Sequence, residues 1–150
     1  MNGISISELT RPDVIAAYEI EKSCLNTAWS KQSIHAFLQK EDAVYLVATF
    51  GIEVVGIAAM YVVAGEGQVM NIAVAPSYRQ RKVGRQLLEK LMETGIKKGA
   101  AFFALEVAEK NLAAVKLYKS MGFYEVGRRK GYYKNDNALL LKKQGDGSCA

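Results

Sequence analysis

The sequence predicts a single α/β domain with a mixed central sheet of about six or seven strands, flanked by about four helices. Two observations support this fold class. Strand-like runs rich in Val, Ile and Tyr are interspersed with amphipathic helical runs over residues 1–142, without a linker, repeat or low-complexity tract between them. The chain has 150 residues, of which 50% are hydrophobic and 23% are charged, and this composition can bury the core of one domain.

The N-terminal part predicts a strand followed by two helices. Ile4 to Glu8 alternates apolar and polar residues, as a half-buried strand does. Thr10 to Asp13 carries a helix-start signal, and we expect that helix to reach about Ser23. Ser30 is placed to cap a second, short helix, whose apolar residues are Ile34, Phe37 and Leu38.

The middle of the chain predicts an antiparallel hairpin and a third strand. Residues 43–50 and 53–63 are rich in Val, Tyr and Ile and are joined through Gly51. Residues 68–74 supply the next strand. These three runs therefore form one continuous part of the sheet.

A long amphipathic helix and a buried strand come next. The helix ends at Gly99, and the apolar residues that recur in it at helical spacing are Leu87, Leu88, Leu91, Met92 and Ile96. Residues 101–108 then return as an apolar strand. A strand, a helix and a further strand in this order are typical of an α/β fold.

The last part of the chain predicts one helix and two short strands. Asn111 is placed to cap the helix, whose apolar stripe ends at Gly122. The strands span 123–126 and 137–141, with a polar and aromatic segment between them. Residues 143–150 contain no core-forming residues and predict a frayed tail.

Composition narrows the class of partners. A net charge of +5 attracts polyanions such as nucleic acid, the ribosome or a phosphorylated cofactor, although many small proteins carry such a charge for solubility alone. The N-terminus lacks a secretory signal and no apolar run can span a bilayer, so we expect a cytoplasmic protein that does not enter a membrane. Cys24 and Cys149 are too few for a disulfide framework, and His35, the one histidine, predicts a surface position and no metal site.

The junction around residue 80 predicts an anion site. A strand ends near Val74, a basic loop follows, and a helix begins near Gly84. The N–H groups and the dipole of a helix N-terminus favour anions, and the nearby positive charges are those of Arg79, Arg81, Lys82 and Arg85. The predicted ligand is therefore a phosphorylated cofactor.

Several motifs in order resemble one known family. They are Asn71-Ile72-Ala73-Val74-Ala75-Pro76, the basic loop into Gly84-Arg85-Gln86-Leu87-Leu88, Leu105-Glu106-Val107, Asn111-Leu112-Ala113-Ala114 and Leu117-Tyr118-Lys119-Ser120-Met121-Gly122-Phe123. Together they resemble the GNAT superfamily of acetyl-CoA-dependent N-acetyltransferases. Within it the chain is similar to the RimI-like enzymes, a likeness that also takes in Ala28-Trp29-Ser30 and Arg128-Arg129-Lys130-Gly131-Tyr132-Tyr133 and covers nearly the whole chain.

The resemblance implies an acetyl-CoA site. The implied cofactor-binding residues are Ile72, Ala73, Val74, Arg79, Gln80, Arg81, Lys82, Val83, Gly84, Arg85 and Asn111. The family loop usually has a glycine where this chain has Lys82. If that position requires a positive φ, Lys82 carries a cost of about 1 kcal/mol, which its charge can offset.

Glu106 is the candidate general base. It lies in an otherwise apolar strand, where a carboxylate is out of place unless it has a task or a partner. A desolvated carboxylate would have a raised pKa, suited to accepting the proton of an amine directly or through water. The alternative is a glutamate at a strand end that faces solvent or pairs with Lys or Arg. The resemblance implies the role of base.

Tyr118 is the candidate general acid. It lies on the inward stripe of its helix, where a hydroxyl could reach the sulfur of a thioester, and the alternative is a core aromatic residue. The resemblance implies the proton donor. Asn111 can cap its helix and also hydrogen-bond the pantetheine arm. Trp29, Tyr132 and Tyr133 predict either contacts with an acceptor peptide or ordinary packing.

The leading functional hypothesis follows from the resemblance. It is acetylation of the N-terminal alanine of a small-subunit ribosomal protein, by direct attack of the amine on acetyl-CoA. The implied partners are acetyl-CoA and that ribosomal N-terminus, without direct nucleic-acid binding. Two alternatives remain open: the same chemistry on a small amine or lysine side chain, and a non-catalytic module that binds CoA or RNA. Cys24 lies in no nucleophile-like constellation, which disfavours a covalent enzyme intermediate.

Overall fold

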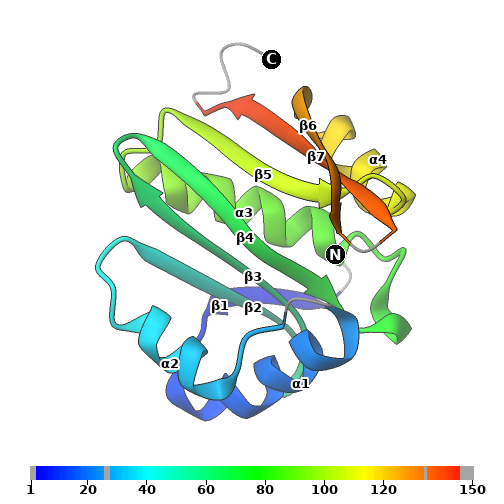
Figure 1. Cartoon of the computed structure of the whole chain (residues 1–150). Coiled ribbons are helices and arrows are strands. Elements are labelled where there is room, and N and C mark those ends of the chain that lie inside the picture. Colours follow the sequence, from blue (N-terminus) through cyan, green and yellow to red (C-terminus); the bar gives the residue numbers. More distant parts are fainter. Residues whose placement is uncertain (1–2, 26–27, 134, 146–150) are drawn as a thin grey trace.

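A computed structural model describes residues 3–25, 28–133 and 135–145 of the chain (Figure 1). Within them the chain forms one mixed sheet in the order β1-β2-β3-β4-β5-β7-β6, which confirms the predicted fold class. The strands are β1 (Ile4–Glu8), β2 (Ala43–Phe50), β3 (Glu53–Val63), β4 (Glu66–Val74), β5 (Phe102–Ala108), β6 (Tyr124–Tyr133) and β7 (Asp136–Gln144). The helices are α1 (Val14–Cys24), α2 (Lys31–Leu38), α3 (Val83–Lys97) and α4 (Leu112–Ser120).

The predicted start and stop signals hold for the N-terminal elements. The β2–β3 hairpin has the predicted bounds and turns at Gly51, whose φ of 63° suits glycine. Ser30 caps α2, because its side chain accepts a hydrogen bond from the Ser33 N–H at 3.0 Å. His35 lies exposed on α2, as predicted.

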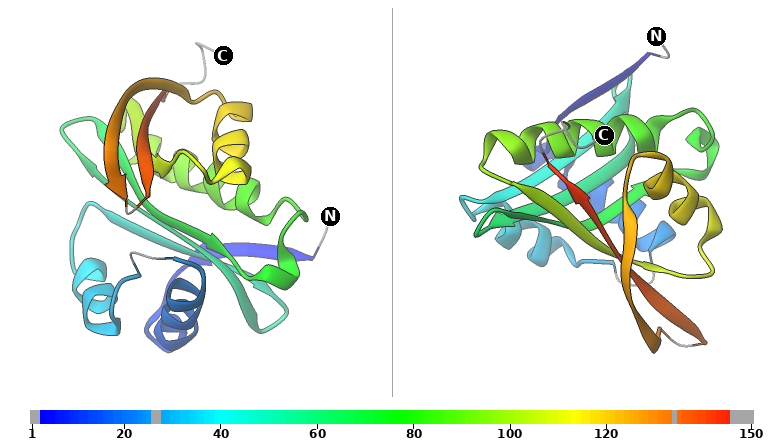
Figure 2. Two further views of the ribbon diagram at one scale, coloured as in Figure 1. Left: turned by 45° about the vertical axis from the view of Figure 1, so that its right-hand side comes forward. Right: turned by 90° about the horizontal axis from the view of Figure 1, so that it is seen from above.

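Two helices cover each face of the sheet (Figure 2). α1 and α2 pack on one face, over a core that includes Ile34, Val47 and Ile57. α3 and α4 pack on the other face, over a second core that includes Leu88 and Phe103. Ile96 does not join the apolar stripe of α3 as predicted, since it is 44% exposed.

Gly95 explains the departure of Ile96. A Cβ atom at Gly95 would lie 2.6 Å from Met60 Cε and 2.8 Å from Phe103 Cε1. The helix backbone therefore contacts the sheet through a residue without a side chain, and the position after it turns toward solvent. The hydrophobic periodicity of the sequence cannot reveal this close approach, because glycine carries no apolar signal.

The sheet divides between β4 and β5. These two strands are parallel and pair only through Glu66–Gln68 and Phe102–Ala104, and the pairing does not continue to residues 69–74 of β4 or 105–108 of β5. Figure 1 shows the two strands diverging beyond this point. The β4 edge therefore offers backbone groups that no neighbouring strand uses.

The C-terminal strands are longer than predicted. Residues 127–133, predicted as part of a segment between strands, belong to β6, which pairs with β7 through contacts such as Arg128 with Leu139. β7 runs to Gln144, two residues into the stretch predicted as a tail, and residues 146–150 lie outside the described part. β6 is an edge strand with mostly exposed residues, so its polar sequence carries no alternation.

Candidate active site

A cavity of about 470 Å³ lies where β4 and β5 diverge. Four residues predicted for the site line it: Ile72 from β4, Glu106 from β5, and Asn111 and Tyr118 from the start and body of α4. The separated strands therefore bring together the candidate base, the candidate acid and part of the candidate cofactor site. Ala73 does not line the cavity, because its side chain is buried in the core beneath α1.

Glu106 is not the desolvated carboxylate that the sequence predicts. Its side chain is 33% exposed, and its Oε1 lies 3.8 Å from Nη2 of Arg129 on β6. The neighbours Leu105 and Val107 point into the α3 and α4 core, so Glu106 points to the opposite face and into the cavity. An apolar strand sequence predicts burial of both faces, but the divergence of β4 leaves this face of β5 open.

Tyr118 is buried, with 5% exposure, and lines the same cavity from the other face of the sheet. Its ring packs on Phe123 at 5.8 Å between centroids. No described residue hydrogen-bonds its hydroxyl, and no described side-chain oxygen is both buried and unpartnered, so the hydroxyl is open to the cavity. Burial raises the pKa of Tyr118, and nearby Tyr133 adds to the rise.

Asn111 caps α4 as predicted. Its Oδ1 accepts a hydrogen bond from the Ala114 N–H at 3.2 Å. The residue is exposed and lines the cavity, and no described residue accepts a hydrogen bond from its amide nitrogen. The cap and a contact with a ligand are compatible, because they use different ends of the amide.

The basic loop lies at the N-terminus of α3, beyond the end of β4. The first bond of the helix runs from the Gln86 N–H to the Lys82 carbonyl at 3.0 Å, so the N–H groups of residues 83–85 precede the helical ladder. The position of Gly84 lies beside α4, since a Cβ there would be 3.4 Å from Leu117 Cδ2. The loop and the cavity thus lie along the same helix, α4.

The arginines of this loop and of the first turn of α3 contact protein groups. Arg79 donates from Nε to the Val74 carbonyl at 3.0 Å, and its Nη2 lies 3.5 Å from the Cys24 sulfur. Arg85 donates to the Ser120 hydroxyl at 3.3 Å. The guanidinium of Arg81 lies over the Tyr78 ring. These contacts hold the end of β4, α4 and the loop together, while the guanidinium groups keep their positive charge beside the α3 N-terminus.

Two loop residues adopt the left-handed conformation that favours glycine. Lys82 has φ 65° and ψ 19°, and Gln80 has φ 63°. The positive φ that the family glycine implies at position 82 is therefore present in this chain with a lysine. The strain is of order 1 kcal/mol at each residue.

Lys82→Gly is expected to raise the KM for acetyl-CoA severalfold at low salt. The backbone at position 82 already has the conformation that glycine allows, so the substitution removes mainly a positive charge beside the predicted pyrophosphate site. Lys82→Gln keeps a long side chain but has no charge, and it should give the same acetyl-CoA KM as Lys82→Gly. The difference between each variant and wild type should become smaller in high salt. A KM for Lys82→Gly below the wild-type value would show instead that the lysine side chain obstructs the cofactor.

The three aromatic residues predicted as possible contacts with an acceptor peptide lie in different surroundings. Trp29 packs on Phe37 at 4.8 Å and on Tyr45 at 6.3 Å between ring centroids, and it lies partly buried against the core of the α1 and α2 face. Tyr133 lines the cavity, whereas Tyr132 is 53% exposed beneath the Arg129 guanidinium. Of the three, only Tyr133 therefore contacts the space where an acceptor would lie.

One polar group beside the cavity was not predicted from the sequence. Glu21 on α1 is fully buried, and its Oε1 accepts hydrogen bonds from the Trp29 N–H at 2.8 Å and from Nδ2 of Asn71 at 2.9 Å. Its Oε2 accepts a hydrogen bond from the Tyr45 hydroxyl. Burial, together with this bond, raises the pKa of Tyr45. Asn71 also lines the cavity, which links this buried network to the site.

Comparison with known proteins agrees with the fold. The model of the acetyltransferase (GNAT) family matches residues 14–123. The chain is 38% identical over 129 residues to the [ribosomal protein bS18]-alanine N-acetyltransferase of Escherichia coli K12, covering 86% of each protein. It is 32% identical over 154 residues to the N-alpha-acetyltransferase RimI of Mycobacterium tuberculosis, covering 97% of this chain and 96% of that protein.

A solved structure of such an enzyme shares the fold of this chain. The crystal structure of the ribosomal-protein-S18-alanine N-acetyltransferase from Escherichia coli superposes with a TM-score of 0.86 at 34% identity, covering 95% of this chain and 94% of the other. No helix in the described ranges is long and apolar enough to cross a membrane. With the family match, the relatives above 30% identity and the shared fold, this chain belongs to the GNAT family of acetyltransferases and is similar to its RimI-like members.

Proposed function

We propose that this acetyltransferase moves the acetyl group of acetyl-CoA to the N-terminal alanine of a ribosomal protein. The observation that carries the proposal is that Glu106 and Tyr118, from opposite faces of the sheet, line one cavity between β4 and β5. The relatives named for acetylation of ribosomal protein bS18 support this acceptor class.

Three features of the chain fit acetyl-CoA. The unpaired edge of β4 at residues 69–74 can hydrogen-bond the amide groups of a pantetheine arm as an added strand would. The N–H groups at the start of α3, with the positive loop beside them, suit a pyrophosphate. The Tyr118 hydroxyl is open to the cavity that the β4 edge lines. When bound, acetyl-CoA supplies the thioester carbonyl that the amine attacks.

Two residues of the cavity each carry out one proton transfer. Most α-amino groups are protonated at pH 7, so the acceptor must first lose a proton, and Glu106 takes it directly or through water. The amine then forms a C–N bond to the acetyl carbon as the C–S bond breaks, and the nitrogen loses its second proton to water. Tyr118 donates a proton to the sulfur as it departs, because a thiolate leaves less readily when it must depart as an anion.

Thiol release from acetyl-CoA tests this proposal. The acceptor is a basic peptide that copies the alanine-first N-terminus of that ribosomal protein, compared with the same peptide already acetylated at its N-terminus. Turnover with the free peptide alone is expected. Turnover with both peptides would identify a lysine side chain as the acceptor, and binding of acetyl-CoA without turnover of either would favour another amine or a non-catalytic role.

A further inference from the structure

Glu21 is a buried carboxylate held by donors from three separate segments. Its partners are the Trp29 N–H before α2, the Tyr45 hydroxyl on β2 and the Asn71 amide on β4. The residue has 0% exposure, and no ion pair within the described residues includes it. All three partners donate, so both carboxyl oxygens act as acceptors.

A buried carboxylate adds little to the free energy of unfolding compared with apolar residues of similar volume. Burying a carboxylate costs several kcal/mol before its hydrogen bonds form, and apolar residues of similar volume often give equal or greater stability. A fully hydrogen-bonded polar network does, however, fix the orientation of every side chain in it. The main effect of the Glu21 network is therefore to fix the orientation of the side chains that contact Glu21. Of these, only Asn71 lines the cavity.

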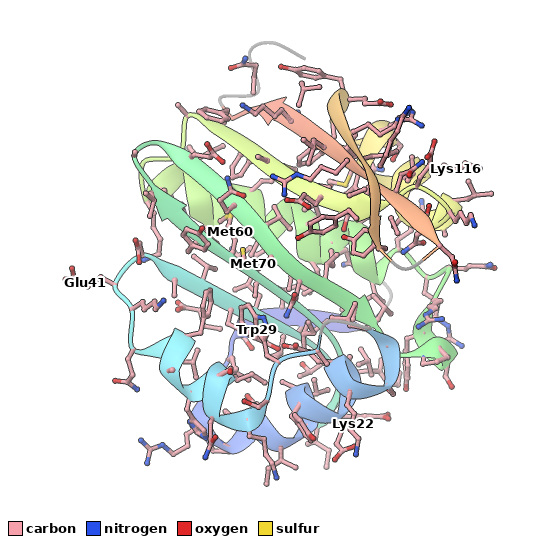
Figure 3. The ribbon with its side chains drawn as sticks, in the orientation of Figure 1. Lys22, Trp29, Glu41, Met60, Met70 and Lys116 are labelled. Atoms are coloured by element: carbon pink, nitrogen blue, oxygen red, sulfur yellow. The ribbon has the colours of Figure 1, made fainter. Side chains whose placement is uncertain are left out.

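A bulge in β4 turns Asn71 toward Glu21. Ala59 pairs with Asn71 and the next residue, Met60, pairs with Val69, so Met70 is an extra residue in β4. Gly67 and Val69 face the α3 core, and strict alternation would put Asn71 there too. The extra residue shifts Asn71 to the α1 face instead. Figure 3 shows Met70 on β4, above Trp29.

The Glu21 carboxylate also decides which end of the Asn71 amide faces the cavity. A carboxylate accepts, so the amide nitrogen must point to Glu21 and the oxygen must point away. No described residue donates to Oδ1 of Asn71, and no described side-chain oxygen is both buried and unpartnered. Oδ1 of Asn71 is therefore an acceptor that is open to the cavity.

Asn71 and Glu106 lie on the same face of the divided sheet. Glu106 points away from the α3 and α4 core on β5, and the bulge gives Asn71 the same direction on β4. Both side chains line the one cavity, from its two strand walls. An amine placed between them would meet two acceptors, one charged and one neutral.

We propose that Oδ1 of Asn71 accepts a hydrogen bond from the acceptor amine and that Glu21 is the positioning residue that aims it. This role rests on the proposed function. The amine gives one proton to Glu106 and donates a remaining N–H to Asn71, so its lone pair is left for the acetyl carbon. The amide oxygen is suited to this task, because it binds the neutral amine without competing for its proton.

Asn71→Ala is expected to raise the peptide KM about tenfold, which is the effect of one lost hydrogen bond, and to leave the acetyl-CoA KM unchanged. Tyr45→Phe is the matched control, since it removes another donor to the same carboxylate but does not line the cavity. Its peptide KM should stay within about twofold of wild type. Thermal unfolding of both variants measures the structural cost separately.

Glu21→Met tests the positioning role with a side chain of similar length that cannot accept these hydrogen bonds. Without an acceptor at residue 21, the Asn71 amide loses the contact that aims it and is free to turn in the cavity. The expected result is a peptide KM raised as in Asn71→Ala, with the acetyl-CoA KM again unchanged. This variant also serves if Asn71→Ala does not fold.

The outcomes separate this role from the proposed function. Normal wild-type turnover with an unchanged peptide KM in Asn71→Ala and in Glu21→Met would overturn the role of Asn71 but leave the proposed function standing. Equal KM increases in Asn71→Ala and Tyr45→Phe would also overturn it, because they would show a purely structural network. Absence of wild-type turnover with every N-terminal peptide would overturn the proposed function and this role with it.

Discussion

Glu106→Gln should lower kcat at pH 7 by about 10²- to 10⁴-fold, which is the usual contribution of a general base. The substitution keeps the size and hydrogen-bonding shape of the side chain but removes its ability to hold a proton. Glu106 lies in the cavity on a face of β5 that contacts none of the core, so the fold should not change. The acetyl-CoA KM should therefore stay near its wild-type value. Thiol release with saturating peptide measures the effect.

The pH dependence distinguishes a base from a structural residue. At pH 9 most of the acceptor amine has already lost its proton, so the defect of Glu106→Gln should shrink as the pH rises. Arg129→Ala is a useful comparison, because it removes the cation 3.8 Å from Glu106 and leaves the carboxylate in place. An exposed pair of this kind contributes little, so Arg129→Ala should lose only a few-fold in kcat. A loss in Glu106→Gln that is equal at every pH would contradict the role of base.

The sequence predicts most of the fold because its signals are local. Ser30 and Asn111 cap their helices as expected, and the β2–β3 hairpin turns at Gly51. These features depend on residues a few positions apart, which periodicity and capping rules can read. The part of β6 after Val126 escaped prediction because it is an edge strand with exposed polar residues. Arg128, for example, forms ion pairs with Glu109 and Glu125.

The candidate site was predictable only in part, because its remaining features depend on distant contacts. Glu21 and Asn71 are 50 residues apart, and the bulge at Met70 that brings them together leaves no mark on the hydrophobic pattern. The exposure of Glu106 follows from the divergence of β4 and β5, which no single strand sequence contains. Local patterns therefore identified the strands and helices that carry the candidate catalytic residues. The sheet topology decides which faces of those strands and helices are open.

Tyr118→Phe should lower kcat by about 10²-fold or more while leaving the acetyl-CoA KM nearly unchanged. The ring packs on Phe123 and is buried, so phenylalanine keeps the apolar contacts and removes only the hydroxyl that is open to the cavity. Burial raises the pKa of Tyr118, and the raised pKa keeps the hydroxyl protonated as the pH rises through 10, its unperturbed value. The group therefore stays able to donate a proton over the whole range in which the acceptor amine becomes neutral.

The leaving group provides the decisive control for Tyr118. If the hydroxyl protonates the departing thiolate, an acetyl donor with a more acidic thiol needs that proton less, and the defect of Tyr118→Phe should shrink with it. Tyr133→Phe is the matched variant, because Tyr133 lines the same cavity from β6 and should show a small loss that does not vary with the donor. A Tyr118→Phe defect that is the same with both donors would contradict a general acid and leave Tyr118 a packing residue.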